Sequence, residues 1–152
     1  MLGGMPTLFL VCGLPGSGKT TAARELEREH NAVRLAPDEW MARIVRDGWD
    51  HERRDAVEKV QWQLAQRLLS LGQNVVLENG FWRRTEREAY RAAAAELGAD
   101  SKLIYCTAPH DELKQRLLTR NADLPPDTFS VTPEQLDEMI PHFEPPGEDE
   151  LR

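Results

Sequence analysis

The chain has 152 residues, of which 40% are hydrophobic and 30% are charged, and its net charge is −7. No apolar run approaches the roughly 18 residues that cross a bilayer, and the run at 8–12 is too short for a signal peptide, so we expect a soluble, cytoplasmic protein. The segment from Glu134 to Glu150 holds seven acidic residues and no lysine or arginine. The rest is nearly neutral, without the basic stripe of a nucleic-acid-binding protein, although local arginines could still line a groove.

Short apolar strands alternate with longer helical patterns, which is typical of a parallel sheet with crossover helices in the α/β class. We expect four strands, at 7–12, 32–35, 74–77 and 102–107, and the sequence leaves a fifth strand open. Cys12 and Cys106 fall in two of these strands, where they are expected to be small, reduced, buried residues. Helices are predicted at 19–30, 38–47, 52–71, 85–97 and 111–120.

Two details of the helices can be predicted from side-chain spacing. Thr85 with Glu88, and Thr132 with Gln135, each have the spacing of a capping box, so a helix is expected to start at each. The apolar residues of 52–71 recur at three- and four-residue steps and predict one buried stripe. That stripe consists of Val57, Val60, Leu64, Leu68 and Leu71.

The whole chain, 1–152, is predicted to form a single domain. The region of about 116–140, with a proline-bounded loop between two helices, is expected to act as a lid. The acidic tail, 141–152, has no strand period and is expected either to pack through Phe143 or to fray.

A phosphate-binding loop is the strongest motif in the chain. The stretch GLPGSGKT satisfies GxxxxGK[ST] and lies after a predicted strand and before a predicted helix. Its backbone N–H groups point toward phosphate oxygens at a helix N-terminus, Lys19 can reach the β- and γ-phosphates, and the Thr20 hydroxyl can ligate Mg²⁺. The residues expected to bind the nucleotide are Gly13, Leu14, Pro15, Gly16, Ser17, Gly18, Lys19, Thr20 and Thr21.

Polar residues follow the second and third strands, and the carboxyl ends of parallel strands open on one edge of the sheet. Asp38 is positioned to accept the proton of an attacking hydroxyl, or it N-caps the next helix. Glu78 could hold Mg²⁺ or the acceptor, or it could be a strand-end residue facing solvent.

The residues after Glu78 extend this edge. Asn79, Arg83 and Arg84 are candidates for contacting the acceptor. Phe81 and Trp82 lie between them and could either stack on an acceptor ring or pack in the core.

Two arginines lie four residues apart near the end of the predicted helix at 111–120. Arg116 and Arg120 point in similar directions and could stabilise the charge on a transferring phosphoryl group. The alternative is that they only complement the helix dipole.

With these residues together, the sequence resembles the small P-loop kinase group, which includes polynucleotide 5′-hydroxyl kinases, chloramphenicol phosphotransferase, gluconate kinases and zeta toxins. The segments that carry the resemblance are GLPGSGKTT, PDEW, VVLENGFWRR and LLTRN. The resemblance implies a P-loop NTPase fold, Asp38 as general base and an arginine lid that contains Arg116 and Arg120. One departure is Glu78-Asn79-Gly80, where polynucleotide kinases tend to have an Asp-Thr-Asn element.

The predicted function is an ATP- and Mg²⁺-dependent phosphotransferase that acts on a hydroxyl of a small-molecule or nucleotide-like acceptor. Lys19, Asp38, Arg116 and Arg120 are the expected catalytic residues, and Thr20 and Glu78 the expected metal ligands. Two alternatives remain open: a nucleotide-binding ATPase or switch without an acceptor, and a zeta-toxin-like nucleotide-sugar kinase. A GTPase is disfavoured because no Asn-Lys-x-Asp element occurs.

Overall fold

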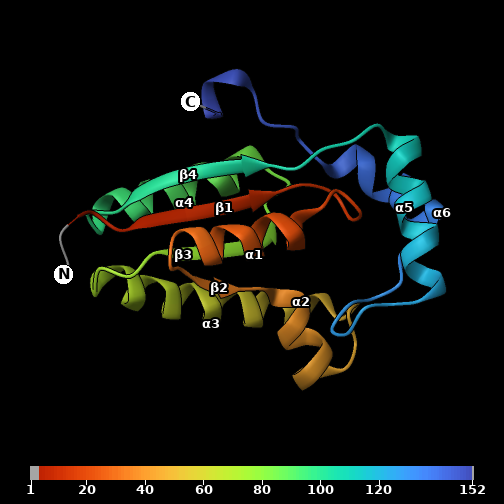
Figure 1. The fold of residues 1–152 in the computed structure, drawn as a ribbon, viewed down its shortest axis with the longest axis horizontal. Helices are drawn as coiled ribbons and strands as arrows, with labels where there is room; N and C mark the ends of the chain where they lie inside the picture. The colour runs from red at the N-terminus through yellow and green to blue at the C-terminus, as the bar shows by residue number, and fades with distance from the viewer. Residues whose placement is uncertain (1–3, 152) are drawn as a thin grey trace.

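The computed structural model describes residues 4–151, which form a parallel four-stranded sheet flanked by helices (Figure 1). The strands are β1 (Thr7–Cys12), β2 (Val33–Leu35), β3 (Val75–Gly80) and β4 (Asp100–Tyr105), and their spatial order is β2-β3-β1-β4. The predicted α/β class with a parallel sheet is confirmed, and the described residues contain no fifth strand.

The helices follow the predicted order, with shifted ends. They are α1 (Lys19–Glu29), α2 (Pro37–Trp40), α3 (His51–Ser70), α4 (Arg84–Glu96), α5 (His110–Ala122) and α6 (Pro133–Met139). A π-helical turn, Met41–Val45, extends α2, and 3-10 turns occupy Ile140–His142 and Glu148–Glu150. No helix in the described part of the chain is long and apolar enough to cross a membrane.

The sheet has a separate apolar layer on each face, because side chains alternate along each strand. Leu8 and Leu10 of β1 pack with residues of α3 and α4, whereas Phe9 and Val11 pack with residues of α1. A third apolar cluster joins α5 and α6 to Leu14 of the loop after β1. The phosphate loop is therefore packed between the sheet and the α5–α6 unit, at the carboxyl ends of the strands (Figure 1).

The prediction for the buried stripe of α3 was wrong in part. Val60 is 50% exposed and Leu71 is 80% exposed, whereas Gln61, Ala65 and Leu69 form the buried face. The helix is turned by one residue relative to the prediction, since the short Ala65 side chain lies against the sheet. The larger Leu64 and Leu68 flank that contact and are only partly buried.

The two capping predictions have opposite outcomes. Thr132 Oγ1 accepts a hydrogen bond from the N–H of Gln135 at 3.1 Å, and Gln135 Oε1 accepts one from the N–H of Thr132 at 2.9 Å, which confirms that box. The Thr85–Glu88 box is wrong. Helix α4 already begins at Arg84, so Thr85 lies inside the first turn and cannot serve as the N-cap.

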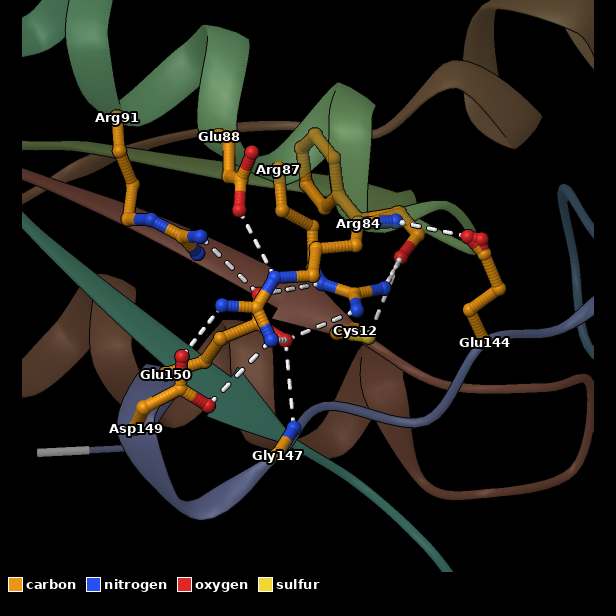
Figure 2. A network of polar contacts seen from close by, with 10 residues as sticks. Cys12, Arg84, Arg87, Glu88, Arg91, Glu144, Gly147, Asp149 and Glu150 are labelled. Carbon is orange, nitrogen blue, oxygen red and sulfur yellow. Dashed lines mark hydrogen bonds and ion pairs between the residues drawn. The ribbon is translucent and has the colours of Figure 1, made fainter.

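As far as Leu151, the acidic tail packs against α4 and is not frayed (Figure 2). Phe143 lies against Tyr105, with ring centroids 6.1 Å apart. The side chains of Glu150 and Arg87 are each 1% exposed and form two hydrogen bonds, at 2.9 and 3.0 Å. Arg87 also donates to the carbonyl oxygen of Phe81 at 2.8 Å, so the tail is coupled to the segment that follows β3.

Candidate active site

The loop between β1 and α1 forms a cradle for an anion. Gly16 and Gly18 have φ angles of +83° and +92°, in the left-handed region that favours glycine. A Cβ atom on Gly13 would lie 2.5 Å from Oγ of Ser17, so this close approach also requires glycine. The Ser17 hydroxyl is buried without a hydrogen-bond partner in residues 4–151, which suits a phosphate oxygen as its missing partner.

Lys19 begins α1 and extends back over the loop. Its Nζ donates a hydrogen bond to the carbonyl oxygen of Gly13 at 3.1 Å. Burial lowers the pKa of the Lys19 ammonium group, and the carboxylates of Asp38 and Glu78 act in the opposite direction. This partly desolvated cation therefore lies within the field of both predicted carboxylates.

Glu78 is buried and holds two partners, which rules out the alternative of a strand-end side chain facing solvent. Its Oε2 accepts a hydrogen bond from Thr20 Oγ1 at 2.8 Å, and its Oε1 accepts one from Arg34 Nε at 3.0 Å. Arg34 also pairs with Glu39 at 2.7 Å. Strand β3 continues to Gly80, so Glu78 lies within the strand and not at its end.

The donor set at Thr20 and Glu78 fits Mg²⁺. Both side chains offer oxygen, and their oxygens are 2.8 Å apart, close enough to share one ion. Mg²⁺ is usually held by one or two protein groups plus waters and substrate phosphates, so a dense cluster of protein ligands is not required. Among residues 4–151, no group of three or more His, Cys, Asp or Glu side chains is arranged to hold a metal.

Asp38 lies in the first turn of α2 and pairs with Arg54 of α3, at 2.5 Å between Nη1 and Oδ1. The N-cap of α2 is Ala36, and Asp38 caps nothing, so the alternative of a capping role was wrong. About half of the Asp38 side chain is exposed (52%), which leaves its carboxylate accessible to a substrate.

Arg116 and Arg120 of α5 each contact a loop that lines the cavity. Arg116 donates to the carbonyl oxygen of Gly16 at 3.3 Å, and Arg120 donates to that of Phe129 at 3.3 Å. Burial lowers the pKa of Arg120, and Asp38 opposes this effect. Its buried Nε has no hydrogen-bond partner in the described residues.

A cavity of about 700 Å³ joins these groups. The loop residues from Leu14 to Thr21 line it, together with Asp38, Glu78, Asn79, Arg83, Arg116 and Arg120. Gly13 lies behind this wall, where its N–H donates to Gly80 at 3.0 Å and its carbonyl accepts from Trp82 Nε1 at 3.3 Å. Residues 125–129, which belong to the region predicted to act as a lid, line the same cavity.

The two aromatic residues after β3 differ in their environment. Phe81 is 1% exposed and contacts Tyr90 edge to face, with ring centroids 5.1 Å apart, so core packing is its main role. Trp82 is half-buried and packs against the α5–α6 cluster.

The structure corrects the prediction that Arg84 contacts the acceptor. This side chain pairs with Glu88 at 2.8 Å and with Asp149 of the tail, and it does not line the cavity (Figure 2). The first turn of α4 directs Arg84 toward the tail, whereas Arg83, one residue earlier, faces the cavity.

Sequence reasoning missed several side chains that line the cavity. Arg54, Asp55 and Glu58 come from α3, and Glu86 comes from α4. The i,i+4 pair of Arg54 and Glu58 was visible in the sequence, but such pairs are common on exposed helix faces and do not point to a site.

A family model described as an AAA domain, AAA_33, matches residues 8–146. The chain belongs to this AAA-domain family. The matched segment begins in β1 and extends past α6, so it contains every cavity residue named above. No curated protein matches the chain.

Solved structures similar to this AAA-domain chain include kinases. A candidate kinase from Chloroflexus aurantiacus is 23% identical, with 95% of this chain and 83% of that chain covered and a TM-score of 0.74. A chain of the Pnkp1/Rnl/Hen1 RNA repair complex is 22% identical, with 91% and 44% covered and a TM-score of 0.73. The Mycobacterium tuberculosis APS kinase, in complex with AMPPNP and APS, is 21% identical, with 91% and 97% covered and a TM-score of 0.61.

These identities are below 25%, so the likeness concerns the fold. At that level the resemblance to small P-loop kinases that the motifs predict is confirmed. The chain spans under half the length of the similar chain in the RNA repair complex.

Proposed function

We propose that the protein is an ATP- and Mg²⁺-dependent phosphotransferase that moves the γ-phosphoryl group to a hydroxyl of a small-molecule or nucleotide-like acceptor. The observation that carries this proposal is one continuous cavity that contains both the phosphate loop and the Asp38 carboxylate. The similarity in fold to kinases also supports it.

In the proposed reaction, Asp38 accepts the proton of the acceptor hydroxyl as its oxygen forms a bond to the γ-phosphorus. The bond between that phosphorus and the β,γ-bridging oxygen breaks, and ADP leaves with the electron pair. The N–H groups of the loop and Lys19 hold the phosphates, and Arg120, aided by Arg116, stabilises the equatorial oxygens. The lid loop at 125–129 excludes water, which favours transfer over hydrolysis.

Thr20 and Glu78 are the groups that would hold the magnesium ion. When bound, Mg²⁺ neutralises charge on the β- and γ-phosphate oxygens. Arg34 pairs with Oε1 of Glu78 and fixes the orientation of this carboxylate. Its other oxygen, Oε2, therefore lies beside Thr20. Oriented ligands of this kind increase metal affinity.

A nucleotide switch without an acceptor is the principal alternative. It would need the cradle and the metal ligands but no further chamber. The cavity continues beyond Asp38 to Arg54, Asn79 and Glu86, which favours a second substrate. A nucleotide-sugar acceptor stays within the proposed class and belongs in the acceptor screen.

The test is transfer of label from γ-labelled ATP to a panel of alcohols, sugars, nucleosides and nucleotide sugars, measured beside bare hydrolysis. Asp38→Asn should reduce transfer by about 10²-fold and leave ATP affinity nearly unchanged. Asp100→Asn, at the opposite end of the sheet, is the matched control. Equal turnover of Asp38→Asn and wild type would remove Asp38 from this role, and hydrolysis with every acceptor ignored would favour the switch.

A further inference from the structure

Charged groups of both signs line the cavity. Lys19, Arg116 and Arg120 surround the phosphate loop, where they match the charge of a triphosphate. The lining residues from α3, the end of β3 and the start of α4 include more carboxylates than cations. We call this region, together with Asp38 of α2, the acceptor end. Besides Glu78, which is already paired with Arg34, its charged side chains are the four carboxylates of Asp38, Asp55, Glu58 and Glu86 and the guanidinium groups of Arg54 and Arg83.

The cations at the acceptor end leave part of this negative charge unpaired. Arg54 is shared between Asp38, at 2.5 Å, and Glu58, at 3.2 Å. Among residues 4–151, neither Asp55 nor Glu86 has an ion-pair partner within 4.0 Å. Two carboxylates that line the cavity are thus available to a ligand.

The pKa values of Glu58 and Glu86 also indicate that the negative charge at the acceptor end is incompletely compensated. Burial raises the pKa of Glu58 to about 7, with Arg54 opposing the shift and the charges of Glu86 and Asp55 adding to it. Burial also raises the pKa of Glu86, with Arg83 as the main opposing charge. A cation bound among these carboxylates would relieve both the burial of charge and the mutual repulsion.

The neutral side chain of Asn79 lies at the acceptor end too, and its amide oxygen is available to a ligand. Oδ1 of Asn79, next to Glu78 on β3, is buried without a hydrogen-bond partner in the described residues. A carbonyl oxygen only accepts hydrogen bonds, so its missing partner is a donor. Arg83 also has no ion-pair partner within 4.0 Å among residues 4–151, so the available groups at the acceptor end are two carboxylates, one amide oxygen and one guanidinium group. The three hydrogen-bond acceptors outnumber the single donor group, which favours a ligand rich in N–H or O–H donors.

We propose that the acceptor alcohol carries a cationic amine, as an amino sugar or aminocyclitol does. This inference rests on the proposed phosphotransferase function and specifies its substrate class. Asp55 and Glu86 bind the ammonium group, Asn79 accepts a hydrogen bond from the acceptor, and the reacting hydroxyl lies at Asp38. An acceptor that bears its own phosphate is repelled by the same carboxylates, which disfavours nucleic-acid ends and sugar phosphates.

The experiment measures binding and transfer of the labelled phosphoryl group for matched compounds, each an amine beside its neutral counterpart. Calorimetry with AMPPNP and Mg²⁺ present compares glucosamine with glucose and glucose 6-phosphate, and 2-deoxystreptamine with myo-inositol. The amines should bind at least 10-fold more tightly than their neutral counterparts, and the phosphate ester should bind most weakly. Asp55→Asn/Glu86→Gln should remove the preference, whereas Glu29→Gln/Glu96→Gln, with the same charge change on exposed positions outside the cavity, should keep it.

The possible outcomes separate this inference from the proposed function. Equal or weaker binding of both amines, or no binding of either, would overturn the inference, even if another alcohol is phosphorylated. A preference that survives in Asp55→Asn/Glu86→Gln would overturn it as well. Tighter binding of the amines without transfer of label to any acceptor would support the inference on substrate charge and contradict the phosphotransferase.

Discussion

Arg54 links two carboxylates of the acceptor end, with Nη1 2.5 Å from Oδ1 of Asp38 and Nε 3.2 Å from Oε2 of Glu58. The first contact orients the proposed base, and the second anchors the guanidinium group on its own helix. Asp38 is half-exposed on a helix of only four residues, so Arg54 is the contact that restricts its side chain.

Removing this contact should impair positioning more than binding. Arg54→Met is expected to reduce transfer by about 10- to 100-fold, because small displacements of a catalytic group have effects of that order. Nucleotide affinity, measured by calorimetry, should stay within about 2-fold, since Lys19 and the loop are untouched. Arg53→Met, one residue earlier on the exposed face of α3, is the control. If both variants turn over like wild type, the contact does not position the base.

The hydrogen bond between Thr20 and Glu78 predicts a metal phenotype. Thr20→Ala should raise the Mg²⁺ concentration for half-maximal activity by about 10-fold or more, because an oxygen ligand and an orienting hydrogen bond are both lost. Thr85→Ala, an exposed threonine of α4, should leave the magnesium titration unchanged. A titration that does not differ between Thr20→Ala and wild type would exclude Thr20 as a ligand.

The two arginines of α5 should differ in their contribution. Arg120→Gln is expected to lower kcat by about 10²-fold or more, with little change in nucleotide affinity, because the Arg120 guanidinium group lines the cavity and its Nε has no hydrogen-bond partner in the described residues. Arg116→Gln should have a smaller effect, since that side chain is exposed and already paired with Glu112 at 2.7 Å. If neither variant changes kcat, the arginines serve only the helix and the lid.

The buried pair of Glu150 and Arg87 predicts a pH-dependent stability. Arg87 is the main cause that lowers the pKa of Glu150 to about 2, below the ordinary value of 4.5. The pair therefore stabilises the fold above about pH 4.5, and this contribution is lost as the pH falls toward 2. Glu150→Gln should lower the free energy of unfolding at pH 7 by on the order of 3 kcal/mol, because it leaves a buried guanidinium group without its counter-ion.

Urea denaturation at pH 7, 5 and 3 measures this difference, which should shrink as the pH falls. Asp149→Asn is the matched control, since its exposed pair with Arg84 is screened by solvent. A Glu150→Gln deficit that is the same at every pH would show that the loss comes from packing and not from charge.

Much of the fold and the phosphate loop could be predicted because the signals are local. The positions of the strands and helices along the chain and the Thr132 cap follow from periods and spacings within one element. The errors arose where a helix starts, or turns its buried face, one residue away from the predicted position. On α3 the small Ala65 decided which stripe faces the sheet, and at the start of α4 a shift of one residue sent Arg84 to the tail and Arg83 to the cavity.

By itself, the amino-acid sequence determined the cradle for a phosphate, because GLPGSGKT specifies a backbone path whose N–H groups and lysine converge within eight residues. Only the tertiary structure decided what lies opposite that cradle. Arg54, Glu58 and Glu86 are brought to Asp38 by the packing of α3 and α4 on the sheet, and no spacing along the chain records that approach. The physical reason is that backbone geometry is set by near neighbours, whereas the charge of a cavity is the sum over side chains from distant elements.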